Sequence, residues 1–210
     1  LIGTQAQGST AGYTSGGFIS NGRVIDKFPF STDANATDVG DTLGSNPAGT
    51  YDGYSGGASS SSHGYLAGGY PSSNVLQKFS FSVDGNATDV GDLSFGNYGK
   101  SGTMSQTHGY MSGGHPSRNT IDKFPFSSDT NASDIGDLTV GRYSAAGSMS
   151  RTHGYTSGGT TATSGLPTYN VIDKFPFASD ANATDVGDLL QFLKEAAGAS
   201  SHSHGYLSGG

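Results

Sequence analysis

The chain has 210 residues, of which 32% are hydrophobic and 13% charged, and it contains 35 glycines. This glycine content excludes a mainly helical protein, because glycine inside a helix costs about 1 kcal/mol relative to alanine, and the low charge is unlike that of a disordered chain. A net charge of −7 without a basic cluster argues against a nucleic-acid partner, and the lack of cysteine excludes disulfides and cysteine-bound zinc. No apolar run reaches the length of a membrane helix, so we expect no membrane insertion.

Three short segments recur in the same order along the chain and define a repeat of about 45 to 50 residues. The first reads GYxSGG or GYLAGG and begins at Gly12, Gly64, Gly109, Gly154 and Gly205. The second reads VIDKFPF or a close variant and occupies residues 24–30, 75–81, 120–126 and 171–177. The third reads DANATDVGD or a close variant and occupies residues 33–41, 84–92, 129–137 and 180–188. A period of this length, with 11 Phe and 11 Tyr at regular spacings, predicts units of short strands.

Each segment predicts its own local structure. In residues 24–30 apolar side chains fall on both sides of an extended chain, so we expect a strand that is covered on both faces. Pro29 cannot donate a ladder hydrogen bond and predicts a strand end or an unpaired edge. DANATDVGD has the composition of a turn, and the Val-Gly-Asp-Leu at its end predicts a short strand. The small residues that precede each GYxSGG segment predict a strand in a crowded place.

The resulting order of a small-residue strand, a strand ending in Gly-Gly, an aromatic strand and an outer strand resembles the kelch repeat. Gly158 and Gly159 match the double glycine of that family, and Arg142 lies where kelch units often carry arginine, but the kelch tryptophan is absent. The resemblance implies an all-β fold, a β-propeller built from kelch-like four-stranded blades. A β-solenoid or a trimeric fibre is the alternative.

The repeat count sets the predicted domain organisation. We interpret residues 1–210 as a single repeat domain, with repeats at about 1–43, 44–95, 96–140 and 141–190 and a partial repeat at 191–210. The two terminal segments do not combine into one complete repeat, since both resemble the same first half of a repeat. We therefore expect a longer natural chain, or a terminal half-repeat that completes a neighbouring chain.

The acidic segment is a candidate calcium site, because its oxygen-bearing side chains alternate as in the DxDxDGxxD loops of integrin-type propellers. The alternative is that these side chains only close a turn. The same segment contains the glycosylation sequon Asn-Ala-Thr or Asn-Ala-Ser in each copy. The candidate ligands are the Asp and Asn residues at equivalent positions of the four copies: Asp33, Asn35, Asp41, Asp84, Asn86, Asp92, Asp129, Asn131, Asp137, Asp180, Asn182 and Asp188.

Histidine and tyrosine residues supply the candidate ligand-binding positions. A histidine precedes the Gly-Tyr of four copies, where it is expected either to bind a ligand or to satisfy backbone groups of a tight turn. The segments 50–62 and 160–169 break the repeat and are rich in small residues and tyrosine, which is typical of adaptable binding loops. The candidates are Tyr51, Tyr54, Tyr169, His63, His108, His153 and His204.

Catalysis has little support in the sequence, since the polar residues recur equivalently while an active site needs only one constellation. We therefore expect no catalytic residues and no cofactor other than calcium. The repeat also resembles tandem repeats of structural or tail-associated proteins of marine bacteriophages. That resemblance implies a structural or adhesive role in a virion or an extracellular appendage, with self-assembly, other virion proteins or a cell-surface glycan as partners. A glycan-binding propeller lectin is the alternative, and a propeller hydrolase or oxidase is the third interpretation.

Overall fold

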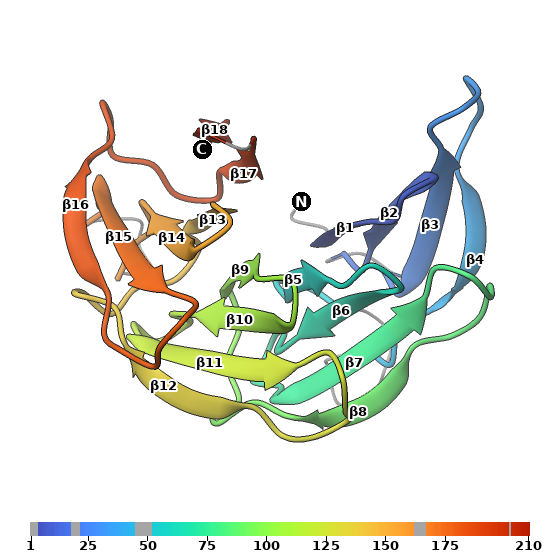
Figure 1. The fold of residues 1–210 in the computed structure, drawn as a ribbon, viewed down its shortest axis with the longest axis horizontal. Coiled ribbons are helices and arrows are strands. Elements are labelled where there is room, and N and C mark those ends of the chain that lie inside the picture. Colours follow the sequence, from blue (N-terminus) through green and yellow to red (C-terminus); the bar gives the residue numbers. More distant parts are fainter. Residues whose placement is uncertain (1–3, 18–21, 45–51, 162–166, 202) are drawn as a thin grey trace. The chain divides into compact units, whose positions relative to one another are not determined.

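The computed structural model describes residues 4–17, 22–44, 52–161, 167–201 and 203–210. All regular structure in these ranges is β-strand, and the strands form small antiparallel sheets (Figure 1). The expected all-β class is therefore confirmed. In the described ranges we find no helix with the length and apolarity needed to cross a bilayer.

The chain divides into two compact units, and each contains two four-stranded sheets. Unit 1 comprises residues 1–98 together with Ser128–Asn131, and unit 2 comprises Gly99–Ser127 and Ala132–Gly210. The sheets of unit 1 are β1 (Thr4–Gln7), β2 (Ala11–Ser15), β3 (Val24–Pro29) and β4 (Thr37–Asp41), then β5 (Gly56–Ser59), β6 (His63–Ala67), β7 (Val75–Ser80) and β8 (Thr88–Asp92).

Unit 2 contains the same strand pattern twice, followed by a two-stranded half-repeat. Its first sheet has β9 (Ser101–Met104), β10 (His108–Ser112), β11 (Thr120–Pro125) and β12 (Ser133–Asp137). Its second sheet has β13 (Ala146–Met149), β14 (His153–Ser157), β15 (Val171–Pro176) and β16 (Thr184–Asp188). The half-repeat is formed by β17 (Ala197–Ser200) and β18 (Gly205–Ser208). Each sheet is a meander in which strands one to four pair in sequence order.

The predicted order of four strands is thus found in all four sheets, with a small-residue first strand in the second, third and fourth sheets, whereas β1 of the first sheet reads TQAQ. Pro29 lies at the end of its strand, as expected, although this strand is central rather than at an edge. One detail differs from the expectation. Only the first part of DANATDVGD is a loop, because TDVGD forms the fourth strand and pairs with the third through a register shift in every sheet.

The glycine of the Gly-Tyr dipeptide makes room for the neighbouring strand. A Cβ atom on Gly109 would overlap the ring of Phe124, which lies opposite it on β11, and Gly154 and Phe175 have the same relation. Gly12 and Phe28 have this relation too, so an aromatic ring covers bare backbone in three of the four sheets, which explains why the segment has glycine at this position.

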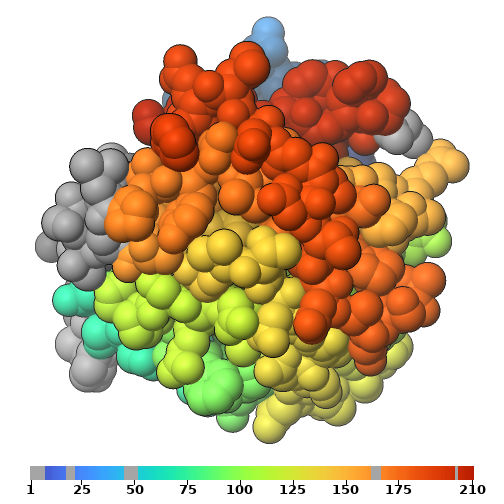
Figure 2. Space-filling view, turned by 90° about the vertical axis from the view of Figure 1, so that its left-hand side faces the viewer, coloured from blue at the N-terminus to red at the C-terminus, as the bar shows by residue number. Residues whose placement is uncertain are grey.

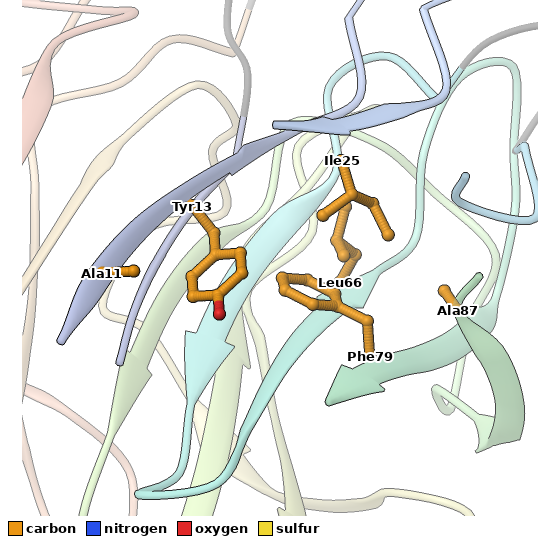
Figure 3. Close-up of a cluster of buried hydrophobic side chains, with 6 residues drawn as sticks. All are labelled: Ala11, Tyr13, Ile25, Leu66, Phe79 and Ala87. Carbon is orange, nitrogen blue, oxygen red and sulfur yellow. The ribbon is translucent and has the colours of Figure 1, made fainter. Parts of the chain in front are cut away.

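The core of unit 1 joins its two sheets (Figure 3). Tyr13 of β2 stacks on Phe81 with ring centroids 4.8 Å apart and lies 5.5 Å from Phe79 of β7. The buried cluster comprises Ala11, Tyr13, Ile25, Leu66, Phe79 and Ala87.

Unit 2 repeats this arrangement with equivalent residues. Tyr110 of β10 stacks on Phe177 at 4.8 Å and lies 5.6 Å from Phe175 of β15. Ile121 and Ala183 join the same buried cluster. In both units, therefore, a tyrosine of one repeat packs against the two phenylalanines of KFPF, or KFSF, in the next repeat.

Candidate functional site

The acidic segment forms a contact between neighbouring repeats, and this contact recurs along the chain. We name residues 33–36, 84–87, 129–132 and 180–183 the junction loops. The first aspartate of a junction loop forms an ion pair with the DKF-type lysine of the preceding repeat: Lys27–Asp84 at 2.8 Å, Lys78–Asp129 at 2.6 Å and Lys123–Asp180 at 2.7 Å. In the first pair, the hydrogen bond that Lys27 donates to Asp84 raises the pKa of Lys27. These pairs are partly exposed, so they contribute specificity more than stability.

The asparagine and alanine of the junction loop bind the end of the preceding fourth strand. The backbone N–H of Asp137 donates to Asn182 Oδ1 at 3.0 Å, and the N–H of Ala183 donates to the carbonyl of Asp137 at 2.8 Å. Asp41 makes the same two bonds with Asn86 and Ala87. A third copy of the asparagine contact joins Asp92 and Asn131 at 3.0 Å. The loop therefore pairs with the outer strand through its backbone and side chain together.

A glycine in the outer strand gives the junction loop space to approach. Gly136 has φ of +153°, and a Cβ atom there would lie 2.7 Å from the carbonyl carbon and oxygen of Ala181. Asp134 fixes this conformation locally, since its Oδ1 accepts the N–H of Gly136 at 3.2 Å. The Asp-x-Gly of the motif thus shapes the strand so that the next repeat can dock on it.

The third strands of the second, third and fourth repeats each carry a residue of a buried polar pair. Asp173 of β15 accepts from Arg142 Nη1 at 2.8 Å, and Asp122 of β11 pairs with Lys100 Nζ at 3.2 Å, with all four side chains fully buried. Burial lowers the pKa of Lys100, and Asp122 partly offsets this effect. The equivalent position of β7 is Gln77, whose Nε2 donates to Asp52 Oδ2 at 2.6 Å. The arginine that suggested kelch units is therefore a core residue that also donates to the carbonyl of Thr156.

The structure brings the predicted calcium ligands together in pairs across junctions. The Asp and Asn residues of the second, third and fourth junction loops bind the preceding repeat, whereas Asp33 and Asn35 of the first loop are exposed. Asp41, Asp92, Asp137 and Asp188 end the four outer strands. Within the described ranges, no group of three His, Asp or Glu side chains is placed to hold a metal ion. Calcium binding stays a prediction.

The predicted histidines lie where the second strand of a repeat begins: His63, His108 and His153 are the first residues of β6, β10 and β14, and His204 directly precedes β18. The Nδ1 atoms of His63, His108, His153 and His204 lie 2.8–2.9 Å from the hydroxyl of the preceding residue, which is Ser62, Thr107, Thr152 and Ser203 respectively. Burial lowers the pKa of His63 and of His108. Ligand binding by these residues stays a prediction, and each imidazole has a local contact with the residue before it.

The predicted tyrosines are placed differently from one another. Tyr51 lies outside the described residues, and Tyr169 is half-buried, with its N–H bonded to the carbonyl of Gly159. Tyr54 lies 5.9 Å from Tyr98, which in turn lies 5.2 Å from Tyr70. Sequence reasoning missed Tyr70 and Tyr98, although Tyr98 shares a Gly-x-Tyr pattern with Tyr143.

Neither a protein-family model nor a curated protein sequence matches this chain. The site must therefore be interpreted from its own geometry. At the first and third junctions one repeat is attached to the next by an ion pair, two hydrogen bonds to backbone groups and an aromatic stack, and the second junction repeats the ion pair and the asparagine hydrogen bond.

Proposed function

We propose that the chain is a non-catalytic structural or adhesive repeat protein, with its sheets arranged as the kelch-like blades of a β-propeller. The observation that supports this proposal is the equivalence of the junctions. The same aspartate, asparagine and glycine serve to attach one repeat to the next in the second, third and fourth copies. Polar residues used in this way build a stable array, whereas catalysis requires one distinct constellation.

Such an array fits a component of a virion or an extracellular appendage. Short meander sheets with backbone groups paired inside each sheet expose few long strand edges, and this favours resistance to aggregation and proteolysis. The resemblance of the repeat to tail-associated bacteriophage repeats supports a place in the virion.

Genomic context and binding to cells test this proposal. Capsid or tail genes beside the coding sequence are expected, together with saturable binding of the fluorescently labelled protein to cells. A neighbourhood of sugar-utilisation genes and no binding to any cell surface would argue against it.

Glycan binding is the second candidate function, because Tyr54, Tyr70 and Tyr98 form a half-buried aromatic group in unit 1. Aromatic side chains of this kind give large contact areas at low entropic cost. A glycan array probed with the protein and with Tyr98→Ala tests it. Hits that disappear in the variant support the lectin, and an array without hits contradicts it.

A further inference from the structure

The second junction loop contains a dipeptide that the other three lack. Residues 84–87 read Asp-Gly-Asn-Ala, whereas Ala34, Thr130 and Ala181 take the place of the glycine in the other copies. An aspartate followed by glycine is prone to rearrange its own backbone, because glycine has no Cβ atom to shield the amide nitrogen from the aspartate side chain. A Cβ atom on Gly85 would meet nothing within 4 Å, so the space beside this glycine is open.

The rearrangement needs no reactant other than water. The amide nitrogen of Gly85 attacks the side-chain carbon of the protonated Asp84 carboxyl group, and a C–N bond forms while the carboxyl hydroxyl leaves as water with the amide proton. The product is a cyclic succinimide. Water then opens the ring, and opening at the main-chain carbonyl leaves Gly85 joined to the former side-chain carbon. The resulting isoaspartate has the same atoms as the original residue, but its main chain runs through the side chain.

Asp84 is accessible to this chemistry. Its side chain is 55% exposed, and its Oδ1 accepts a hydrogen bond from Lys27 at 2.8 Å. An exposed ion pair of this kind is weak, so it should slow the attack by no more than about fivefold. The junction loop of the fourth repeat is exposed as well, with 56% of the Asp180 side chain accessible, and Figure 2 shows the orange atoms of that repeat at the surface of unit 2.

The other Asp-Gly pair of the sequence, Asp52–Gly53, is held in place. Asp52 is 2% exposed, and its two carboxylate oxygens accept hydrogen bonds from Ser55 and Gln77, both at 2.6 Å. The main chain is held too, since the carbonyl of Gly53 accepts the N–H of Tyr70 at 2.8 Å. The Asp52 carboxyl group therefore reaches the following nitrogen only if the fold opens locally, which costs free energy.

Isoaspartate in the second junction loop changes the contact between the first and second repeats. The main chain becomes longer by one methylene group, and the carboxylate that pairs with Lys27 moves. Asn86 and Ala87 follow directly, and they bind Asp41 through hydrogen bonds of 3.0 and 2.8 Å. A longer loop cannot keep these two hydrogen bonds and the ion pair in register at the same time.

We propose that Asp84 converts spontaneously to isoaspartate in the folded chain, and that this modification loosens the junction between the first and second repeats. The aspartates of the other junction loops precede residues with a Cβ atom and react more slowly. The change is therefore confined to one contact within unit 1. This inference goes beyond the proposed structural role and does not depend on it.

Peptide mapping of the aged protein tests the proposal. The intact chain is kept for several weeks in slightly acidic buffer at body temperature, then unfolded, digested with trypsin and fragmented by electron transfer in a mass spectrometer. Asp84, Asp52 and Asn21, which can give the same product by deamidation at Asn21–Gly22, fall in the separate peptides 79–100, 28–78 and 1–23. Isoaspartate should accumulate at residue 84 about tenfold faster than at residue 52, or more. No isoaspartate at residue 84, or equal amounts at both positions, would overturn the proposal.

Gly85→Ala is the matched control, because alanine stands at this position in the first and fourth repeats and has room here. This variant should form the product far more slowly, whereas Lys27→Met should form it up to about fivefold faster. Aged wild-type protein should also unfold at a lower urea concentration than fresh protein, and aged Gly85→Ala should unfold like its fresh counterpart. Wild-type protein that carries the isoaspartate yet unfolds like fresh protein would contradict the loosening of the junction.

Discussion

Replacing Gly136 by alanine should disrupt the junction between the third and fourth repeats, and Gly187→Ala is its matched control. Both glycines have nearly the same backbone, with φ of +153° and +144°, so an alanine at either position carries a similar conformational cost, about 1–3 kcal/mol. Only at residue 136 does the new methyl group meet the junction loop, 2.7 Å from Ala181. The difference between the two variants therefore reports the junction alone.

The magnitude follows from the contacts that the loop would lose. Moving the loop away breaks the hydrogen bonds of Asp137 to Asn182 and Ala183, each worth about 0.5–1.5 kcal/mol. It also exposes the methyl group of Ala183, worth about 0.8 kcal/mol. Gly136→Ala should thus lower the free energy of unfolding by about 2–4 kcal/mol more than Gly187→Ala. Urea denaturation followed by far-UV circular dichroism measures this, and equal destabilisation by the two variants would refute the junction as described.

Three further predictions concern single contacts. Asn182→Ala should lower the free energy of unfolding by about 1 kcal/mol, because it removes the acceptor for the N–H of Asp137. Asn35→Ala in the exposed first loop should change it by less than about 0.5 kcal/mol. Thermal melts compare the two variants, and equal losses would contradict the role assigned to Asn182. Lys100→Met should lower the free energy of unfolding by about 3–5 kcal/mol, because it leaves Asp122 buried without its cation. In urea titrations, the double variant with Asp122→Leu should recover most of that loss. A double variant as unstable as the single one would count against the ion pair. Burial raises the pKa of Tyr110 above its ordinary value of 10.0, so the stability it contributes is present below pH 10 and is lost as the pH rises toward the folded-state pKa. Melting temperatures between pH 8 and about 11 should therefore fall less steeply for Tyr110→Phe, and parallel curves would show that this residue is not responsible.

The strand order could be predicted from the sequence because each segment carries a local signal. Glycine pairs end the second strand, small residues mark the first, and the alternation of residues 24–30 identifies the third. The fourth strand was harder to place, since its Thr-Asp start resembles turn chemistry. It becomes a strand because its backbone pairs with the third strand, while the junction loop of the next repeat docks on its end, which is a contact between residues about 45 positions apart.

The role of the acidic segment could not be obtained from spacing alone. Alternating oxygen ligands are common to calcium loops and to this junction loop, and only coordinates show that Asn182 bonds to Asp137 of another repeat. The lysine of DKFPF was visible in every copy, yet its partner lies in the following copy, so no local pattern relates the two.

The buried polar pairs differ between repeats whose sequences are otherwise nearly identical. One copy joins Lys100 to Asp122, another joins Arg142 to Asp173, and a third joins Asp52 to Gln77. A third strand of the third or fourth repeat that inserted into the second sheet would place its aspartate beside Asp52, and β7 inserted into either of those sheets would leave a buried cation without its carboxylate, at a cost of several kcal/mol. The second repeat is thereby distinguished from the third and fourth, whose Asp–cation pairs are interchangeable, and exchange of its third strand during folding is disfavoured.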